Sequence, residues 1–204
     1  VALQGAQVLS WVAGGRERLY LSPRAVRDGQ AAIRGGIPLC FPQFNQRGPL
    51  PKHGFARNLT WSADAAQADA DTTRLLLHLQ AGVHTRAWWP QAFAAQLDVV
   101  LAPGQLQVVC SVHNTGGEAW DFTIALHSYL RVDDIAQARV QGLAGCARWD
   151  AVADVHGTQS GDIAFAGEYD SVFAASPSPL NLLDGAQGLD ITQSPSMGQT
   201  VVWN

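Results

Sequence analysis

Three segments of the chain, at residues 73–80, 95–101 and 106–112, alternate apolar and polar side chains in a strand-like pattern. A period of two places every second side chain on the same face of a half-buried β-strand, whereas a helix needs a period of 3.6. Pro103 and Gly104 join the second segment to the third, which predicts a tight turn between them. The sequence therefore predicts an antiparallel sheet.

Further strand-like segments lie on both sides of this sheet. Gly14 and Gly15 separate the first two and predict an opening hairpin, and residues 114–117 predict a hairpin turn after the third strand of the sheet. The one stretch with helical potential, residues 63–71, is short and rich in Asp and Ala, and we interpret it as a loop or a single turn. The further strand-like segments cover residues 6–12, 18–21, 122–130, 161–173 and 198–203.

The composition agrees with an all-β chain. Its 204 residues include 20 glycines and 10 prolines, which supply the turns of a sandwich or barrel, and 47% are hydrophobic, enough to bury a sizeable core. No repeat and no linker divides the sequence, so we predict a single domain over residues 1–204.

Charge and cysteine content exclude several classes of function. The net charge is −4, which does not provide the basic surface that nucleic acids or anionic membranes require. No apolar run is long enough for a membrane helix. The three cysteines, Cys40, Cys110 and Cys146, are widely spaced, which predicts buried thiols in a reducing cytoplasm rather than a disulfide framework.

Known catalytic and cofactor motifs are missing from the sequence. The histidines have no His-x-His or His-Glu-x-x-His spacing, so we expect no metal. Gly35-Gly36 is not followed by the Gly-Lys-Ser/Thr ending of a phosphate-binding loop, and no Gly-x-Ser-x-Gly elbow occurs.

The strand pattern breaks between residues 33 and 61, where the polar side chains Arg34, Gln43, His53 and Arg57 lie among glycines and prolines. A rigid loop with such groups suits a polar ligand. The alternative is a structural loop in which the arginines pair with local carboxylates and the histidine caps backbone groups. His127 and Tyr129 share one face of the strand predicted at residues 122–130, where they either line a pocket or belong to the core.

Taken together, these segments resemble the aldose 1-epimerase (mutarotase) superfamily, and within it the branch described as glucose-6-phosphate 1-epimerase. The Arg-Gly-Gly-Ile-Pro and His-Gly-Phe-Ala-Arg motifs are the most specific. The similar blocks follow the same order along the whole chain, at residues 5–11, 21–23, 33–38, 40–44, 53–58, 89–90, 125–130, 168–170 and 201–204.

The resemblance implies a large antiparallel β-sandwich that interconverts the α and β anomers of a hexose 6-phosphate without a cofactor. His127 matches the histidine that donates a proton to the ring oxygen, and His53 matches its companion. The positions that match substrate contacts are Arg34, Arg57, Asp170 and, more weakly, Gln43.

Two other functions stay open at this point: an aldose 1-epimerase that acts on free hexoses, and a non-catalytic carbohydrate-binding β-sandwich of the same fold. We expect a small sugar or sugar phosphate as the only partner, and a monomer.

The resemblance also concerns the ends of the chain. In the family the general base is a glutamate in a late strand, beyond the block that resembles residues 201–204, and Gly5 matches an internal strand. We therefore expect that strands are missing at both ends of the sequence, that the base lies C-terminal to Asn204, and that residues 1–204 alone catalyse poorly.

Overall fold

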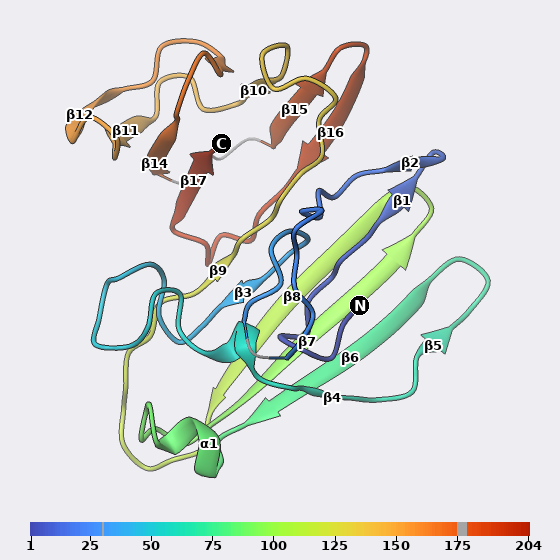
Figure 1. Cartoon of the computed structure of the whole chain (residues 1–204), viewed down its shortest axis with the longest axis vertical. Helices are drawn as coiled ribbons and strands as arrows, with labels where there is room; N and C mark the ends of the chain where they lie inside the picture. Colours follow the sequence, from blue (N-terminus) through green and yellow to red (C-terminus); the bar gives the residue numbers. More distant parts are fainter. Residues whose placement is uncertain (30, 175–178) are drawn as a thin grey trace. The chain divides into compact units, whose positions relative to one another are not determined.

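The computed structural model describes residues 1–29, 31–174 and 179–204. Its strands pair antiparallel, and the sheets are not closed into a barrel (Figure 1), so the all-β prediction is confirmed. The chain folds into two compact units, Val1–Arg131 and Val132–Asn204. None of the helices among the described residues is long and apolar enough to cross a membrane.

The first unit contains three sheets. Strands β4, β6, β7 and β8 form the largest one in that order, with β5 also paired to β6, while β1 pairs with β2 and β3 pairs with β9. The elements of this unit are β1 (Val12–Ala13), β2 (Arg16–Glu17), β3 (Leu39–Cys40), the 3₁₀ turn η1 (Ala56–Asn58), β4 (Ser62–Ala63), β5 (Gln67–Ala68), β6 (Thr73–Gln80), α1 (Val83–Arg86), β7 (Phe93–Ala102), β8 (Gln105–Asn114) and β9 (Ala125–Leu126).

Strands β6, β7 and β8 match the three alternating segments of the sequence. Leu77, Leu97 and Cys110 lie opposite one another in register, and Leu77 and Leu97 are fully buried. Gly104 makes the predicted turn with a φ of 71°. The alternation predicted these strands because one face of the sheet is buried and the other is in contact with solvent.

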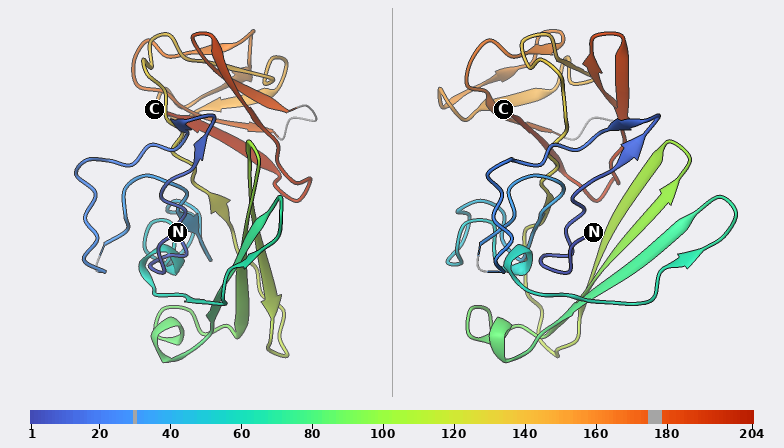
Figure 2. Two further views of the ribbon diagram at one scale, coloured as in Figure 1. Left: turned by 90° about the vertical axis from the view of Figure 1, so that its right-hand side faces the viewer. Right: turned by 45° about the vertical axis from the view of Figure 1, so that its right-hand side comes forward.

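The irregular segment before β4 covers the buried face of this sheet, as Figure 2 shows for the blue and cyan part of the chain. Aromatic side chains from this segment and from the sheet pack against one another in the core. Phe41 lies edge-on against Phe93, with 5.3 Å between the ring centroids. Trp61 is also buried and donates from its indole N–H to the carbonyl of Ala56 (3.0 Å). The large buried residues of this core include Leu19, Leu39, Phe41, Phe55, Trp61, Leu77, Phe93 and Leu97.

Several local predictions for this unit were wrong in whole or in part, among them the strands expected at residues 6–12 and 18–21, of which only Val12 lies in a strand. Residues 63–71 hold the end of β4 and all of β5, because Asp69 closes a tight turn by accepting the N–H groups of Asp71 and Thr72 and so returns the chain to β6. Residues 114–117 do not make a hairpin, because the next strand, β9, pairs with β3 instead of β8. Of residues 122–130, only Ala125 and Leu126 are regular strand.

The second unit consists of two four-stranded antiparallel sheets, β13-β10-β15-β16 and β12-β11-β14-β17. Its buried apolar side chains come from both sheets and include Val140, Ile163, Phe173 and Leu182. The strands are β10 (Arg139–Gln141), β11 (Ala147–Asp150), β12 (Val155–Thr158), β13 (Ile163–Ala164), β14 (Asp170–Ala174), β15 (Leu180–Asp184), β16 (Gln187–Ile191) and β17 (Gln199–Trp203). The strands expected at residues 161–173 and 198–203 are therefore present, the first as two short strands.

Candidate active site

A short irregular ladder brings the two histidine-bearing regions together. Beyond the β3–β9 pair, His127 donates its backbone N–H to the carbonyl of Pro38 (2.9 Å), and Tyr129 donates to the carbonyl of Gly36 (2.8 Å). Residues 127–129 therefore run beside the Arg-Gly-Gly-Ile-Pro motif. The ladder is irregular because the two glycines and the proline of that motif do not form a continuous strand.

The ring of His53 lies edge-on against the ring of His127, with 5.3 Å between their centroids and 83° between their planes. The ring of Tyr129 stacks on the ring of His127, with 5.1 Å between their centroids, and the ring of Phe44 lies 5.3 Å from the ring of His53. Two histidines that the sequence separates by more than seventy positions thus form one cluster.

Backbone contacts determine which nitrogen of His53 carries the proton. The backbone N–H of Asn45 donates to Nδ1 of His53 (3.2 Å), so Nδ1 is an acceptor and the proton is on Nε2. His53 has a φ of 69°, and Gly54 follows with a φ of 68° against the carbonyl of Phe41, where a Cβ would lie only 2.2 Å from the oxygen. The His-Gly pair therefore makes a turn that few other residue pairs could adopt.

Both histidines are less basic than a free imidazole. Burial, the Arg57 guanidinium, His127 and Lys52 lower the pKa of His53 from 6.5 to about 4. Burial also lowers the pKa of His127, as do Arg57 and Lys52, although a hydrogen bond with its own backbone acts in the opposite direction. The cluster is therefore neutral imidazole beside fixed positive charge.

Three cations, Arg34, Lys52 and Arg57, act on the two histidines or on Tyr129. Among the residues that the structure describes, no carboxylate lies within ion-pair distance of Arg34, Lys52 or Arg57. Arg57 donates from Nη2 to the carbonyl of Lys52 (2.9 Å), and its buried Nε has no hydrogen-bond partner. The alternative of a structural loop is therefore wrong in its pairing of Arg34 and Arg57 with local carboxylates, whereas its other part holds, because His53 does bind a backbone N–H.

The positive charges of the site also act on Tyr129. Burial raises the pKa of its phenol, while the positive charges of Arg34 and Arg57 lower it. The sequence placed Tyr129 beside His127 but gave it no role. Cys40 is neutral here, because burial raises the pKa of its thiol to about 12.

Gln43 is occupied by its own loop. Its amide donates to the carbonyls of Asn45 and Leu50 (3.0 Å each), and its oxygen accepts the N–H of Leu50 (2.9 Å). Asp170 begins β14 in the second unit and is exposed. Direct contacts of Gln43 and Asp170 with a sugar stay predictions.

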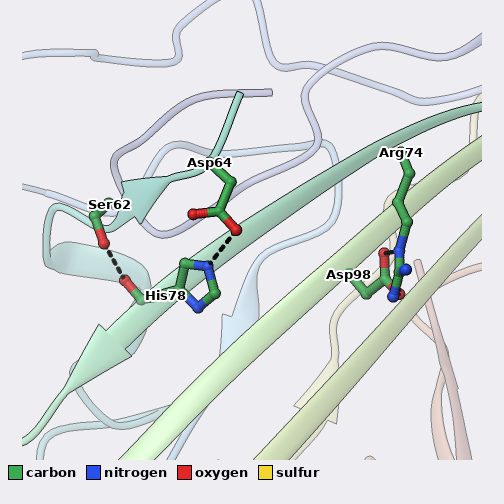
Figure 3. A network of polar contacts seen from close by, with 5 residues as sticks. All are labelled: Ser62, Asp64, Arg74, His78 and Asp98. Carbon is green, nitrogen blue, oxygen red and sulfur yellow. Dashed lines mark hydrogen bonds and ion pairs between the residues drawn. The ribbon is translucent and has the colours of Figure 1, made fainter. Parts of the chain in front are cut away.

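A second group of polar residues lies on the solvent side of the large sheet (Figure 3). Asp64 contacts Nε2 of His78 (3.1 Å), but the Ser62 hydroxyl donates to the backbone carbonyl of His78 (3.4 Å) and not to its ring. These three residues therefore do not form a nucleophile relay. Among the described residues, no group of three or more His, Cys, Asp and Glu side chains is arranged to hold a metal ion.

A family model described as aldose 1-epimerase matches residues 1–204. The chain belongs to the aldose 1-epimerase family. A protein of Cenchrus ciliaris with the printed name "Putative glucose-6-phosphate 1-epimerase" is 36% identical over 221 residues, which is 100% of this chain and 66% of the relative. A protein of the same name from Escherichia coli (strain K12) is 40% identical over 146 residues, 70% of this chain and 48% of the relative.

A solved structure has a similar fold. The Slr1438 protein of Synechocystis sp. PCC 6803 superposes with a TM-score of 0.88 at 25% identity, over 100% of this chain and 75% of that one. The chain thus spans between about half and two thirds of the length of the two named relatives. The resemblance to the family in the sequence is confirmed.

Proposed function

We propose that this protein interconverts the α and β anomers of a hexose 6-phosphate. The observation that carries the proposal is the group of cations Arg34, Lys52 and Arg57, which lack carboxylate partners among the described residues and whose charges reach His53, His127 or Tyr129. Guanidinium groups suit phosphate, whereas a free hexose carries no charge that would need them. Membership of the aldose 1-epimerase family supports the type of reaction.

In the proposed reaction a base takes the proton of the C1 hydroxyl. The electrons of that O–H bond form the C1=O double bond as the bond from C1 to the ring oxygen breaks, and His127 gives a proton to the ring oxygen. Rotation about C1–C2 then presents the other face of the aldehyde, and the same steps run in reverse. His53, edge-on to His127, binds the same part of the sugar.

The electrostatics of the site connect substrate binding to proton donation. Arg57 and Lys52 lower the pKa of His127 in the free protein. A phosphate dianion bound to these cations offsets their charge, and so raises the pKa of His127 toward neutrality, where an imidazole can both hold and release a proton. A free hexose brings no such charge.

The base and the sugar-binding carboxylate belong to the proposal as well. The charged groups that act on the two histidines within the described part of the chain are cations or the other histidine. We therefore keep the expectation that a glutamate beyond Asn204 is the base and that Asp170 binds sugar hydroxyls. A monomer in the cytoplasm, acting on a small sugar phosphate, also stays part of the proposal.

Calorimetry on the 204-residue chain tests the substrate class. We expect glucose 6-phosphate and inorganic phosphate to bind, and Arg34→Ala to weaken both by about tenfold through the loss of a charge-assisted contact. Glucose affinity should not change in this variant. Arg86→Ala, in the exposed α1 helix, is the matched control. Equal affinity for glucose and glucose 6-phosphate would contradict the proposal and favour an epimerase for free hexoses.

Polarimetry on the full gene product tests the reaction. The equilibration of freshly dissolved α-glucose 6-phosphate, after subtraction of the uncatalysed rate, should fall about 10²–10⁴-fold in His127→Ala, as for the loss of a general acid. An unchanged rate would refute the assignment of His127. A wild-type protein that binds sugar phosphate without catalysis would support the carbohydrate-binding alternative instead.

A further inference from the structure

Gln7 is a fully buried polar residue that the proposed function does not use. It follows Gly5 and Ala6, which both have positive φ values, and its side chain is 0% exposed. The backbone around it joins the N-terminal bend, where Gln7 and Ala2 exchange hydrogen bonds of 3.1 and 2.9 Å. This placement directs the amide inward, toward the Arg-Gly-Gly-Ile-Pro motif.

The two N–H groups of the Gln7 amide bind on either side of Arg34. Nε2 donates to the carbonyl of Ile33 (3.0 Å) and also to the carbonyl of Gly35. These are the residues immediately before and after Arg34. One side chain therefore binds the peptide group that precedes Arg34 and the Gly35–Gly36 peptide group that lies one residue beyond it, and so restrains the backbone on both sides of Arg34.

Other contacts hold the same bend from the opposite side. The carbonyl of Arg34 accepts the N–H of Ser22 (3.0 Å), and Gly35 has a φ of 117° with no room for a Cβ, which would lie 2.5 Å from the carbonyl of Tyr20. Arg34 itself is exposed. The bend is thus rigid at its base and projects a single cation outward.

The Gln7 side chain also has an unfavourable feature. Its Oε1 is buried and has no hydrogen-bond partner among the residues that the structure describes, and a buried polar atom in that state is destabilising. An apolar side chain of the same size would avoid this cost but would leave the Ile33 and Gly35 carbonyls without donors. The two donated hydrogen bonds are therefore the feature that this position requires.

We propose that Gln7 is a positioning residue for Arg34, and through Arg34 for the phosphate group of the substrate. The identity of the ligand in this inference rests on the proposed function. The effect of Gln7 on the backbone around Arg34 does not. Gln7 contacts no substrate itself. It holds the guanidinium in the direction that a bound phosphate needs, and so lowers the conformational cost of binding.

The structural part is tested without ligand. Gln7→Met keeps the size of the side chain and removes both donors, and amide exchange measured by NMR should then be about tenfold faster at Ser22, whose N–H binds the Arg34 carbonyl. Gln4→Met is the matched control, because Gln4 makes a similar bond to the carbonyl of Ala31 (2.7 Å), three residues from Arg34. Unchanged exchange at Ser22 in the Gln7 variant would overturn the inference.

The functional part is a double-mutant cycle measured by calorimetry. Gln7→Met should weaken glucose 6-phosphate about tenfold and leave glucose unchanged, but should cause no further loss in a chain that already carries Arg34→Ala. If the losses multiply, or if both ligands weaken equally, Gln7 has only a general structural role. Gln7→Asn, whose shorter amide cannot span both carbonyls, serves if the methionine variant does not fold.

The two proposals fail in different ways. If Arg34→Ala leaves glucose 6-phosphate affinity unchanged, the proposed phosphate contact is wrong, while the exchange at Ser22 still decides the role of Gln7. If Arg34→Ala weakens binding and Gln7→Met does not, the proposed function stands and the positioning role is overturned.

Discussion

His53 shows at the residue scale how the backbone sets the chemistry of a side chain. Its Nδ1 accepts the N–H of Asn45, so a proton added at Nδ1 would face another N–H group and break that bond. The ring is also 9% exposed and close to Arg57 and Lys52. Burial, hydrogen bonding and charge thus all favour the neutral imidazole, and the folded chain holds a proton on His53 less tightly than the unfolded chain does.

This difference predicts a pH dependence of stability. Because the pKa of His53 falls from 6.5 in the unfolded chain to about 4 in the folded one, the unfolded state binds more protons between these values. The free energy of unfolding should therefore fall as the pH is lowered through this window, and be fully retained above it. His53→Asn, which tolerates a positive φ and cannot be protonated, should have a shallower slope in urea denaturation.

Carboxylates also titrate in this pH range, so the contribution of His53 is measured by comparing the pH dependence of stability in the variants with that of the wild type. His84→Asn, at an exposed position of the short helix, should keep the wild-type slope. A His53→Asn variant with the same slope as the wild type would show that His53 does not titrate differently in the folded and unfolded chains.

The sequence predicted some of these residues and missed others for a physical reason. Arg34, His53, Arg57 and His127 carry distinctive chemistry and stand in specific motifs, so the resemblance could identify them. Gln7 could not be found in this way, because a single amide side chain has no partner until the path of the chain brings Ile33 and Gly35 to it. Hydrogen bonds between a side chain and distant backbone leave no local pattern.

At the scale of elements, predictability follows regularity. β6, β7 and β8 have one buried and one solvated face, and their alternation gave their positions closely. β3 and β9 have two regular residues each. The rest of their ladder passes through Pro38 and Gly36, where the backbone is irregular and side chains do not alternate between two faces. The candidate active-site region is thus a part of the first unit that the period-two pattern predicted poorly.

The loop that carries Lys52 and His53 depends on one amide. Gln43 makes three hydrogen bonds to the backbone of Asn45 and Leu50, and the Asn45 carbonyl also accepts the N–H of His53 (3.0 Å). Gly48 passes so close that a Cβ there would lie 2.4 Å from Oε1 of Gln43. The amide thus closes the loop on itself and ties it to the site.

Gln43→Leu should therefore loosen the loop. The loss of these bonds in a side chain that is 3% exposed should lower the free energy of unfolding by about 1–3 kcal/mol. Amide exchange at Leu50 should rise, and glucose 6-phosphate should bind more weakly, because Lys52 and His53 lose their fixed positions. Gln46→Leu, in the same exposed loop, is the control. A sugar affinity that falls with no change in exchange at Leu50 would instead support a direct hydroxyl contact of Gln43.

At the scale of the whole molecule, the distribution of charge is uneven. The chain has a net charge of −4, but its single lysine, Lys52, immediately precedes His53 and lies within the electrostatic reach of both histidines. A local group of cations can attract an anion although the molecule repels it, because salt screens charges beyond about 8–10 Å. The sign of the net charge therefore does not decide which ligand this site binds.

This charge distribution gives a selective chemical test of the site, because Lys52 is the one lysine of residues 1–204 on which an amine-specific acetylating reagent can act. If phosphate binds beside Lys52, then glucose 6-phosphate at about ten times its Kd should slow acetylation of Lys52 about tenfold, while glucose should not. Mass spectrometry of peptides measures the extent of acetylation at Lys52. Acetylation should also weaken sugar phosphate binding, because it removes one of the three cations. Equal protection by glucose would show that the sugar, and not its phosphate, lies beside Lys52.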